Sequence, residues 1–116
     1  MSNGRIKLVL TEEADNFIKG LPYAAAKKID SNIKRIMQGE RNAELFKKLD
    51  GTDIWEFRTL FNKIKYRLFA FWGTRGNTLV IVTHGIVKKT QKTPAKEIAK
   101  AERIRQEYFN EKSKKK

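Results

Sequence analysis

Basic residues recur in consecutive strand-like segments of the second half of the sequence, where they could bind a phosphate. Arg58 and Arg67 lie in two such segments, and Lys88 and Lys89 follow the end of a third. An arginine guanidinium makes planar, bidentate contacts to phosphate oxygens, and a lysine ammonium contacts them as a point charge. A cluster of these groups can bind a scissile phosphate and stabilise negative charge as it develops. The spacing predicts a phosphate site but does not by itself name a reaction.

A structural role is open for each of these candidates. Arg58 could pair with a nearby carboxylate, that of Asp53 or Glu56, because such pairs are common on protein surfaces. Arg67 could extend from a sheet edge with its charge in water, and the lysines could form a solvated loop. His84 comes at the end of the third segment, where it is either a satisfied strand-end histidine or a group that exchanges protons.

The composition of the chain limits which chemistry is open to it. It has 116 residues, no cysteine, one histidine and a formal net charge of +13. The lack of cysteine excludes disulfides and a cysteine nucleophile, and the single histidine excludes a histidine-rich metal site. The positive charge favours nucleic acid as a partner, ahead of an acidic membrane, although it could serve solubility alone. No stretch approaches the ~20 apolar residues of a membrane span and no signal peptide is recognisable, so we expect a cytoplasmic protein that binds no membrane.

Hydrophobic spacing and turn signals predict a small α+β domain. Residues 5–10 alternate as in a half-buried strand. Thr11 then starts a helix as its N-cap, Pro22 ends it, and a second helix follows. Three further strands come next, and a last helix begins with Thr93 as N-cap and Pro94 in its first turn. The three strands are expected at residues 54–60, 65–72 and 78–84.

The resulting order, βααβββα, allows a compact domain with a mostly antiparallel sheet. We expect the helices on one face of it, which would leave the other face free for a partner. Tyr108 is expected to pack on the apolar stripe of the last helix. Aromatic residues at strand spacing are expected in the core rather than as base-stacking surfaces; these are Trp55, Phe57, Phe69, Phe71 and Trp72. One domain is predicted over residues 1–110, followed by a basic tail at 111–116.

Three sequence blocks resemble the RelE/HigB-type toxins of bacterial toxin–antitoxin pairs, most closely the phage-derived HigB-like branch of the RelE/ParE superfamily. The blocks are Trp-Glu-Phe-Arg at 55–58, Tyr-Arg-Leu-Phe at 66–69 and Lys-Lys-Thr-Gln-Lys-Thr-Pro at 88–94. The resemblance is specific over residues 54–108, whereas over residues 1–53 it extends only to the fold. It implies the RelE-like fold, in agreement with the predicted order of elements. It also implies a ribosome-dependent mRNA endonuclease that uses no metal or other cofactor.

The resemblance further implies a reaction and a role for each basic residue. In this family the ribose 2′-OH attacks the adjacent phosphate of a codon in the ribosomal decoding site, which explains a substrate that is RNA and not DNA. Carried over to this sequence, Arg67 stabilises the scissile phosphate and Arg58 binds or positions it. Lys88 and Lys89 bind phosphate and assist proton transfer, and His84 is a candidate base. RNA binding is further expected of Lys65 and Lys92.

Partners are implied in the same way. A cognate HigA-like antitoxin with a helix-turn-helix domain would neutralise the toxin, the ribosome and its mRNA would be the target, and operator DNA would be reached only through the antitoxin. Two alternatives remain open on the sequence. One is a non-catalytic toxin that binds DNA gyrase, as in the ParE branch, and the other is a plain nucleic-acid-binding module.

Overall fold

The computed structural model describes residues 6–73 and 78–114, without the side chain of Lys114. The elements follow in the order β1 (Lys7–Leu10), α1 (Glu12–Lys19), α2 (Tyr23–Met37), β2 (Phe46–Lys48), β3 (Trp55–Phe61), β4 (Ile64–Trp72), β5 (Leu79–Lys88) and α3 (Ala95–Lys114). The α+β class and the order of the predicted elements are confirmed, with β2 as an addition. Arg5 and residues 74–77, between the second and third strands of the predicted meander, lie outside the described residues.

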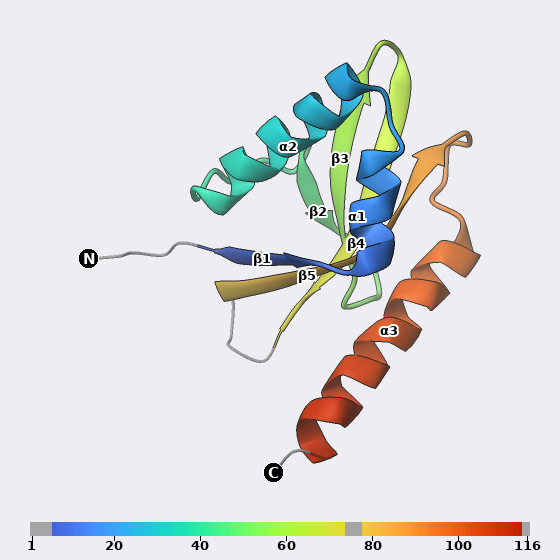
Figure 1. The fold of residues 1–116 in the computed structure, drawn as a ribbon. Coiled ribbons are helices and arrows are strands. Elements are labelled where there is room, and N and C mark those ends of the chain that lie inside the picture. The colour runs from blue at the N-terminus through green and yellow to red at the C-terminus, as the bar shows by residue number, and fades with distance from the viewer. Residues whose placement is uncertain (1–5, 74–77, 115–116) are drawn as a thin grey trace.

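The described strands form one sheet in the order β1-β5-β4-β3-β2 (Figure 1). β3, β4 and β5 make the expected antiparallel meander. Asn62 and Lys63 have positive φ between β3 and β4, as a two-residue hairpin turn requires. β1 pairs with β5 in parallel, so the sheet is mixed. The short β2 pairs with β3 and forms the edge of the sheet, and Phe46 stacks on Trp55 there with 4.7 Å between ring centroids.

The residue that begins α1 also fixes this helix to the sheet. The Thr11 side chain accepts a hydrogen bond from the Ala14 N–H at 3.1 Å, which confirms the predicted N-cap. The Thr11 hydroxyl donates to the carbonyl of Thr83 in β5 at 2.7 Å. On the same strand, a Cβ added at Gly85 would collide with the ring of Phe17 in α1. α1 therefore lies closer to β5 than a larger residue at position 85 would allow.

The helices divide between the two faces of the sheet, which corrects the expectation that they share one face. One core cluster lies under α1 and α2. A second cluster lies under α3, where Ala101 packs with Phe69, Phe71 and Ile81, and α3 runs apart from α1 and α2 in Figure 1. The reason lies in β4, which is buried at every position from Tyr66 to Phe71. A strand that is apolar on both sides needs a cover on each side.

A β-bulge in β5 determines which of its side chains face α3. Phe69 pairs with His84 and Ala70 pairs with Val82, so Thr83 is an extra residue on β5. An extra residue reverses the alternation of side chains along a strand. Val82 accordingly packs in the cluster under α1 and α2, whereas His84 stacks on Phe69 with 4.9 Å between ring centroids.

The same bulge decides where the end of β5 points. Because side chains alternate along a strand, Lys88 faces the same side as His84. Lys88 pairs with Lys65 of β4, and Lys65 shares its face with Arg67. Without the extra residue, Lys88 would point toward the α1 face and away from Arg67.

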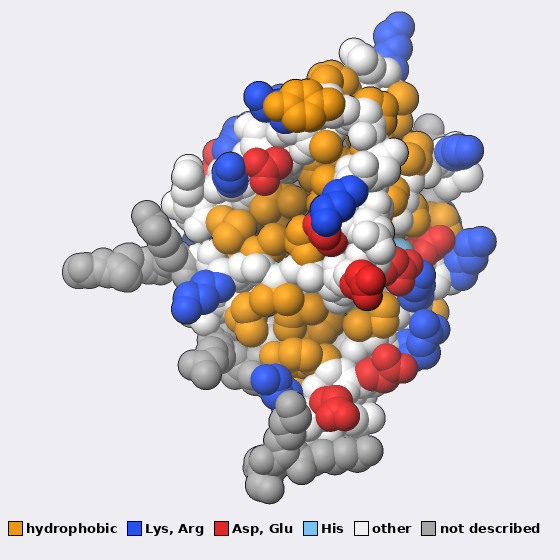
Figure 2. All heavy atoms as spheres, viewed as in Figure 1, with side chains coloured by type: hydrophobic (Ala, Val, Ile, Leu, Met, Phe, Trp, Pro, Cys, Tyr) orange, Lys and Arg blue, Asp and Glu red, His pale blue; other side chains and the backbone are white. Residues whose placement is uncertain are grey.

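α3 begins and ends differently from the prediction. The Pro94 carbonyl accepts the first helical hydrogen bond, from the Glu97 N–H at 3.0 Å, so Thr93 is not the N-cap. α3 reaches Lys114, so residues 111–114 extend the helix, while 115–116 lie outside the described residues. In the space-filling view of Figure 2, basic and acidic side chains are interspersed on the side where α3 runs. Among the residues that the structure describes, no helix is long and apolar enough to cross a membrane.

Candidate active site

Basic side chains from three strands meet on the α3 face of the sheet. Arg58 of β3 pairs with Arg67 of β4, and Lys65 of β4 pairs with Lys88 of β5. Residues directly opposite one another on neighbouring strands place their side chains close together on one face. The predicted residues Arg58, Arg67, Lys65 and Lys88 are thus brought together, and we call these four residues the basic cluster. Like charges in such pairs repel, so the cluster needs an anion to stabilise it.

Glu56 of β3 supplies negative charge beneath the cluster. Its Oε1 lies 3.5 Å from Arg67 Nε and 3.6 Å from Arg58 Nε, so Glu56 is the carboxylate partner that the sequence left open for Arg58. Its Oε2 accepts a hydrogen bond from the Thr93 hydroxyl at 2.8 Å. Glu56 is only 2% exposed, so its charge is directed at its protein partners and not at solvent.

Arg67 is the most deeply placed cation of the cluster. It is 5% exposed, and its Nη1 donates to the Tyr66 carbonyl at 3.1 Å. Burial lowers the pKa of Arg67; the charge of Glu56 opposes this shift and that of Arg58 adds to it. The Nε atoms of Arg67 and Arg58 are buried without a hydrogen-bond partner among the described residues. Both Nε atoms face Glu56, and the excess of positive charge over this one carboxylate would attract a further anion.

Lys88 is a cation of the cluster whose pKa is lowered by its surroundings. Burial is the largest cause that lowers its pKa, followed by the positive charge of Arg67, and Glu56 opposes the shift. Arg58 and Lys65 lower it further. A lysine with a lowered pKa gives up its proton more readily than one in water, which suits proton transfer.

A basic hollow borders the cluster at the tip of the β3–β4 hairpin. It is lined by Lys63 and Lys65 from the hairpin and by Lys88, Lys89, Thr90 and Gln91 from the end of β5, with Ile64 and Val87. Lys89 and Lys92 are exposed in the loop before α3, where the Thr90 hydroxyl donates to the Lys92 carbonyl at 2.7 Å. The sequence analysis did not select Lys63; its place in a hairpin turn next to Asn62 was the signal that could have found it.

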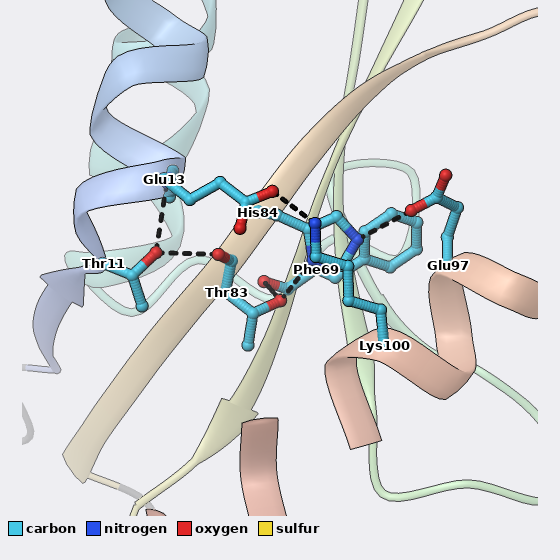
Figure 3. A network of polar contacts seen from close by, with 8 residues as sticks. Thr11, Glu13, Phe69, Thr83, His84, Glu97 and Lys100 are labelled. Atoms are coloured by element: carbon cyan, nitrogen blue, oxygen red, sulfur yellow. Dashed lines mark hydrogen bonds and ion pairs between the residues drawn. The ribbon is translucent and has the colours of Figure 1, made fainter. Parts of the chain in front are cut away.

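His84 lies apart from this surface, inside the core. Its Nε2 is 3.0 Å from Glu97 Oε1 and its Nδ1 is 2.8 Å from the Thr83 hydroxyl (Figure 3). The residue is 2% exposed. Burial is the main cause that lowers its pKa, and the hydrogen bond to Glu97 opposes this shift. With both nitrogens engaged, His84 presents no free atom to a substrate, which argues against the role of base.

His84 belongs to a polar network that extends from α1 through β5 to α3. Lys100 of α3, next to the ring, forms an ion pair with Glu13 of α1, and Figure 3 shows the chain of contacts that runs from α1 through β5 to α3. The position of His84 is therefore explained by helix packing.

Tyr108 and three of the five aromatic residues expected in the core pack there, whereas Trp55 and Trp72 are half-buried. The ring of Tyr108 packs edge-on against Phe71 with 5.4 Å between centroids, which confirms its packing role. Phe57, Phe69 and Phe71 are buried and are therefore not stacking surfaces for bases. Within residues 6–73 and 78–114, no group of three or more His, Cys, Asp or Glu residues could hold a metal ion.

Solved structures with the same fold are bacterial toxins. A free form of E. coli RelE with two arginines replaced by alanine is 17% identical over 86% of this chain and 97% of that chain, with a TM-score of 0.60. The isolated E. coli RelE toxin is 19% identical over 85% of this chain and 98% of that chain, with a TM-score of 0.54. A chain of the intact E. coli RelBE toxin–antitoxin complex is 18% identical over 75% and 99%, with a TM-score of 0.54. The class is therefore that of the RelE toxin fold.

The family follows from a match of the sequence to a family model. Residues 16–106 match the model described as phage-derived protein Gp49-like. The chain belongs to this family, whose members are RelE/HigB-type toxins, and the expected membership is confirmed. No curated protein sequence is significantly similar to the chain.

Proposed function

We propose that this toxin is a ribosome-dependent mRNA endonuclease. The observation that carries the proposal is the basic cluster around Glu56, on a part of the sheet face that lies beyond the start of α3. Four cations against one carboxylate leave an excess of three positive charges there. A phosphate flanked by further phosphates, as in an RNA strand, matches such a site better than a single small anion does. The fold shared with E. coli RelE supports the proposal.

The cluster can support cleavage by the 2′-OH of the substrate. The 2′-OH loses its proton to solvent water as its oxygen forms a bond to the adjacent phosphorus, the bond to the 5′ oxygen breaks, and a cyclic phosphate and a 5′-OH result. Arg67 and Arg58 offset the negative charge that grows on the phosphate oxygens. Lys88, with its lowered pKa, delivers a proton to the departing 5′ oxygen. We assign no chemical step to His84.

An RNA strand bound at the basic cluster can continue along the basic hollow. Lys65 and Lys89 line it, and Lys92 is exposed in the following loop. We assign these lysines to the phosphates that flank the cleaved bond. Contacts of this kind weaken as salt is raised.

A protein partner is part of the proposal. The E. coli RelBE structure holds a toxin together with its antitoxin, and we propose a cognate antitoxin for this chain. On the resemblance to HigB-type toxins, this partner is HigA-like with a helix-turn-helix domain, and operator DNA is bound only through it. An acidic surface on the antitoxin would be attracted to a chain with a net charge of +13.

Primer extension on a defined mRNA in a reconstituted translation reaction tests the proposal. Wild type is compared with Arg67→Ala and with the double variant Lys88→Ala/Lys89→Ala; Lys28→Ala, an exposed lysine of α2, is the matched control. Cuts that need the ribosome, vanish in the first two variants and persist in the control are expected. A folded wild type that makes no cuts would overturn the proposal, and a supercoiling assay would then test gyrase binding.

A further inference from the structure

Glu56 has a place in the site that phosphate binding alone does not explain. It sits among the basic cluster, yet negative charge there weakens the attraction for RNA. Among the described residues, the ion pairs of Arg58 and Arg67 both go to this carboxylate. Glu56 offsets the repulsion between the two arginines, and its paired contacts also constrain the geometry of the site.

Burial excludes direct contact between Glu56 and the reacting atoms. The residue is 2% exposed, its Oε1 faces the two arginines and its Oε2 is occupied by the Thr93 hydroxyl at 2.8 Å. A 2′-OH could not come within hydrogen-bond reach without displacing these partners. Glu56 must therefore act through the residues that it touches.

The contacts of Glu56 orient both guanidinium groups. The carboxylate lies near the Nε atom of each arginine, at 3.5 Å for Arg67 and 3.6 Å for Arg58. Each Nη1 donates to a backbone carbonyl, that of Tyr66 at 3.1 Å and that of Ala43 at 3.4 Å. In the described part of the chain, the Nη2 groups make no such hydrogen bond. Each guanidinium is therefore held from its protein side, with one nitrogen left for a phosphate oxygen.

The second oxygen of Glu56 connects the sheet to the loop that follows β5. Thr93 is the last residue before Pro94, whose carbonyl begins α3. The hydrogen bond from Thr93 to Glu56 spans 37 positions of sequence and closes the loop that carries Lys89 and Lys92. One buried carboxylate thus sets the positions of both arginines and of the basic loop.

We propose that Glu56 is a positioning residue, which holds Arg58, Arg67 and, through Thr93, the basic loop in the geometry that cleavage requires. This inference rests on the proposed function. Small misplacements of catalytic groups lower the rate of the chemical step much more than they lower binding. Loss of Glu56 should accordingly reduce kcat and leave KM nearly unchanged, or lower it, since a negative charge near the RNA is removed.

The test measures cleavage by Glu56→Gln, Glu56→Asp and Thr93→Val over a range of pH and substrate concentrations. Glu56→Gln keeps the shape and the acceptor for Thr93 but removes the charge, and we expect kcat to fall by about 100-fold. Thr93→Val should give a smaller loss, and Glu56→Asp should recover part of the activity. Glu107→Gln, in an exposed ion pair of α3, is the control and should match wild type. Thermal unfolding identifies any variant that fails to fold. If the Glu56 variants do not fold, the kcat of Thr93→Val decides the test.

The outcomes separate the two proposals. A wild type that leaves ribosome-bound mRNA intact overturns the proposed function and this inference with it. An active wild type with Glu56→Gln and Thr93→Val both at the wild-type rate overturns the inference alone. If Glu56→Gln lowers kcat but leaves the shape of the pH–rate profile unchanged, the result supports a positioning role. Loss of one limb of the profile would make Glu56 a proton-transfer group and would equally overturn the inference.

Discussion

Two regions of the same sheet face differ sharply, although the same strands build both. Along β4, Phe71 and Phe69 are covered by α3 in an apolar cluster, whereas Arg67, two residues earlier on the same side, joins the basic cluster. The first region removes apolar surface from water, and the second concentrates charge of one sign at a cost to stability. The comparison teaches that stability and proposed function depend on nearby positions of one strand, so substitutions at Phe71 and Arg67, only four residues apart, should have opposite consequences.

The largest expected effect is on the covered region. Phe71→Ala should lower the free energy of unfolding by about 3–5 kcal/mol, since it removes a fully buried ring and leaves a cavity under α3. Urea denaturation measures the loss, and the fraction that remains folded should cleave at the normal rate. A loss below about 1 kcal/mol would mean that α3 is not held by this cluster.

The matching substitution in the charged region should have the opposite pattern, with cleavage lowered and stability maintained. Arg67→Met keeps much of the side-chain volume but removes the cation, so cleavage should fall by about 100- to 1,000-fold. The free energy of unfolding should stay the same or rise by about 1 kcal/mol, because a desolvated like-charge neighbour of Arg58 disappears. Arg103→Met, at an exposed position of α3, is the control for both measurements. A strong destabilisation by Arg67→Met would erase the distinction between the two regions.

The opposite face of the sheet offers a third, smaller test. Gly85→Ala should lower the free energy of unfolding by about 1–3 kcal/mol, since the new methyl group meets the ring of Phe17. Gly20→Ala is the matched control, because a Cβ there makes only ordinary contacts. Equal thermal stability of the two variants would show that α1 can move away from β5 without cost.

The smallest expected effect is on the dependence of stability on pH. The pKa of His84 is lowered in the fold, first by burial, from its ordinary value of 6.5. As the pH falls through 6.5, the unfolded chain therefore binds a proton before the folded chain does, and the free energy of unfolding decreases. His84→Gln should reduce this slope between about pH 8 and about pH 5. An unchanged slope would assign the acid sensitivity to other groups.

Local signals in the sequence were enough to predict most elements. The alternation of the strands, the Thr11 cap and the stripe that carries Tyr108 all follow from spacing and turn chemistry. β2 was missed because a strand of three residues has no period to detect, and it depends on pairing with β3.

The site was predictable in its residue types but not in its arrangement. Arg58, Arg67 and Lys88 were selected by charge and spacing, yet their meeting on one face depends on the extra residue Thr83 in β5, and no local signal marks that bulge. Glu56 was considered only as a partner for Arg58. Its contact with Thr93, 37 positions away, arises from tertiary packing, which a single sequence does not display.

The parallel pairing of β1 with β5 has a consequence for the timing of synthesis. Thr11 and Thr83, which join α1 to β5, are 72 residues apart, and contacts between distant parts of a chain form late and slowly. A ribosome adds roughly 5–20 residues per second, so the sheet stays open during the seconds in which the residues between Thr11 and Thr83 are added. Thr93, which closes the basic loop on Glu56, leaves the ribosome later still. We therefore expect the basic cluster and its loop to assemble only after residues up to Thr93 have left the ribosome.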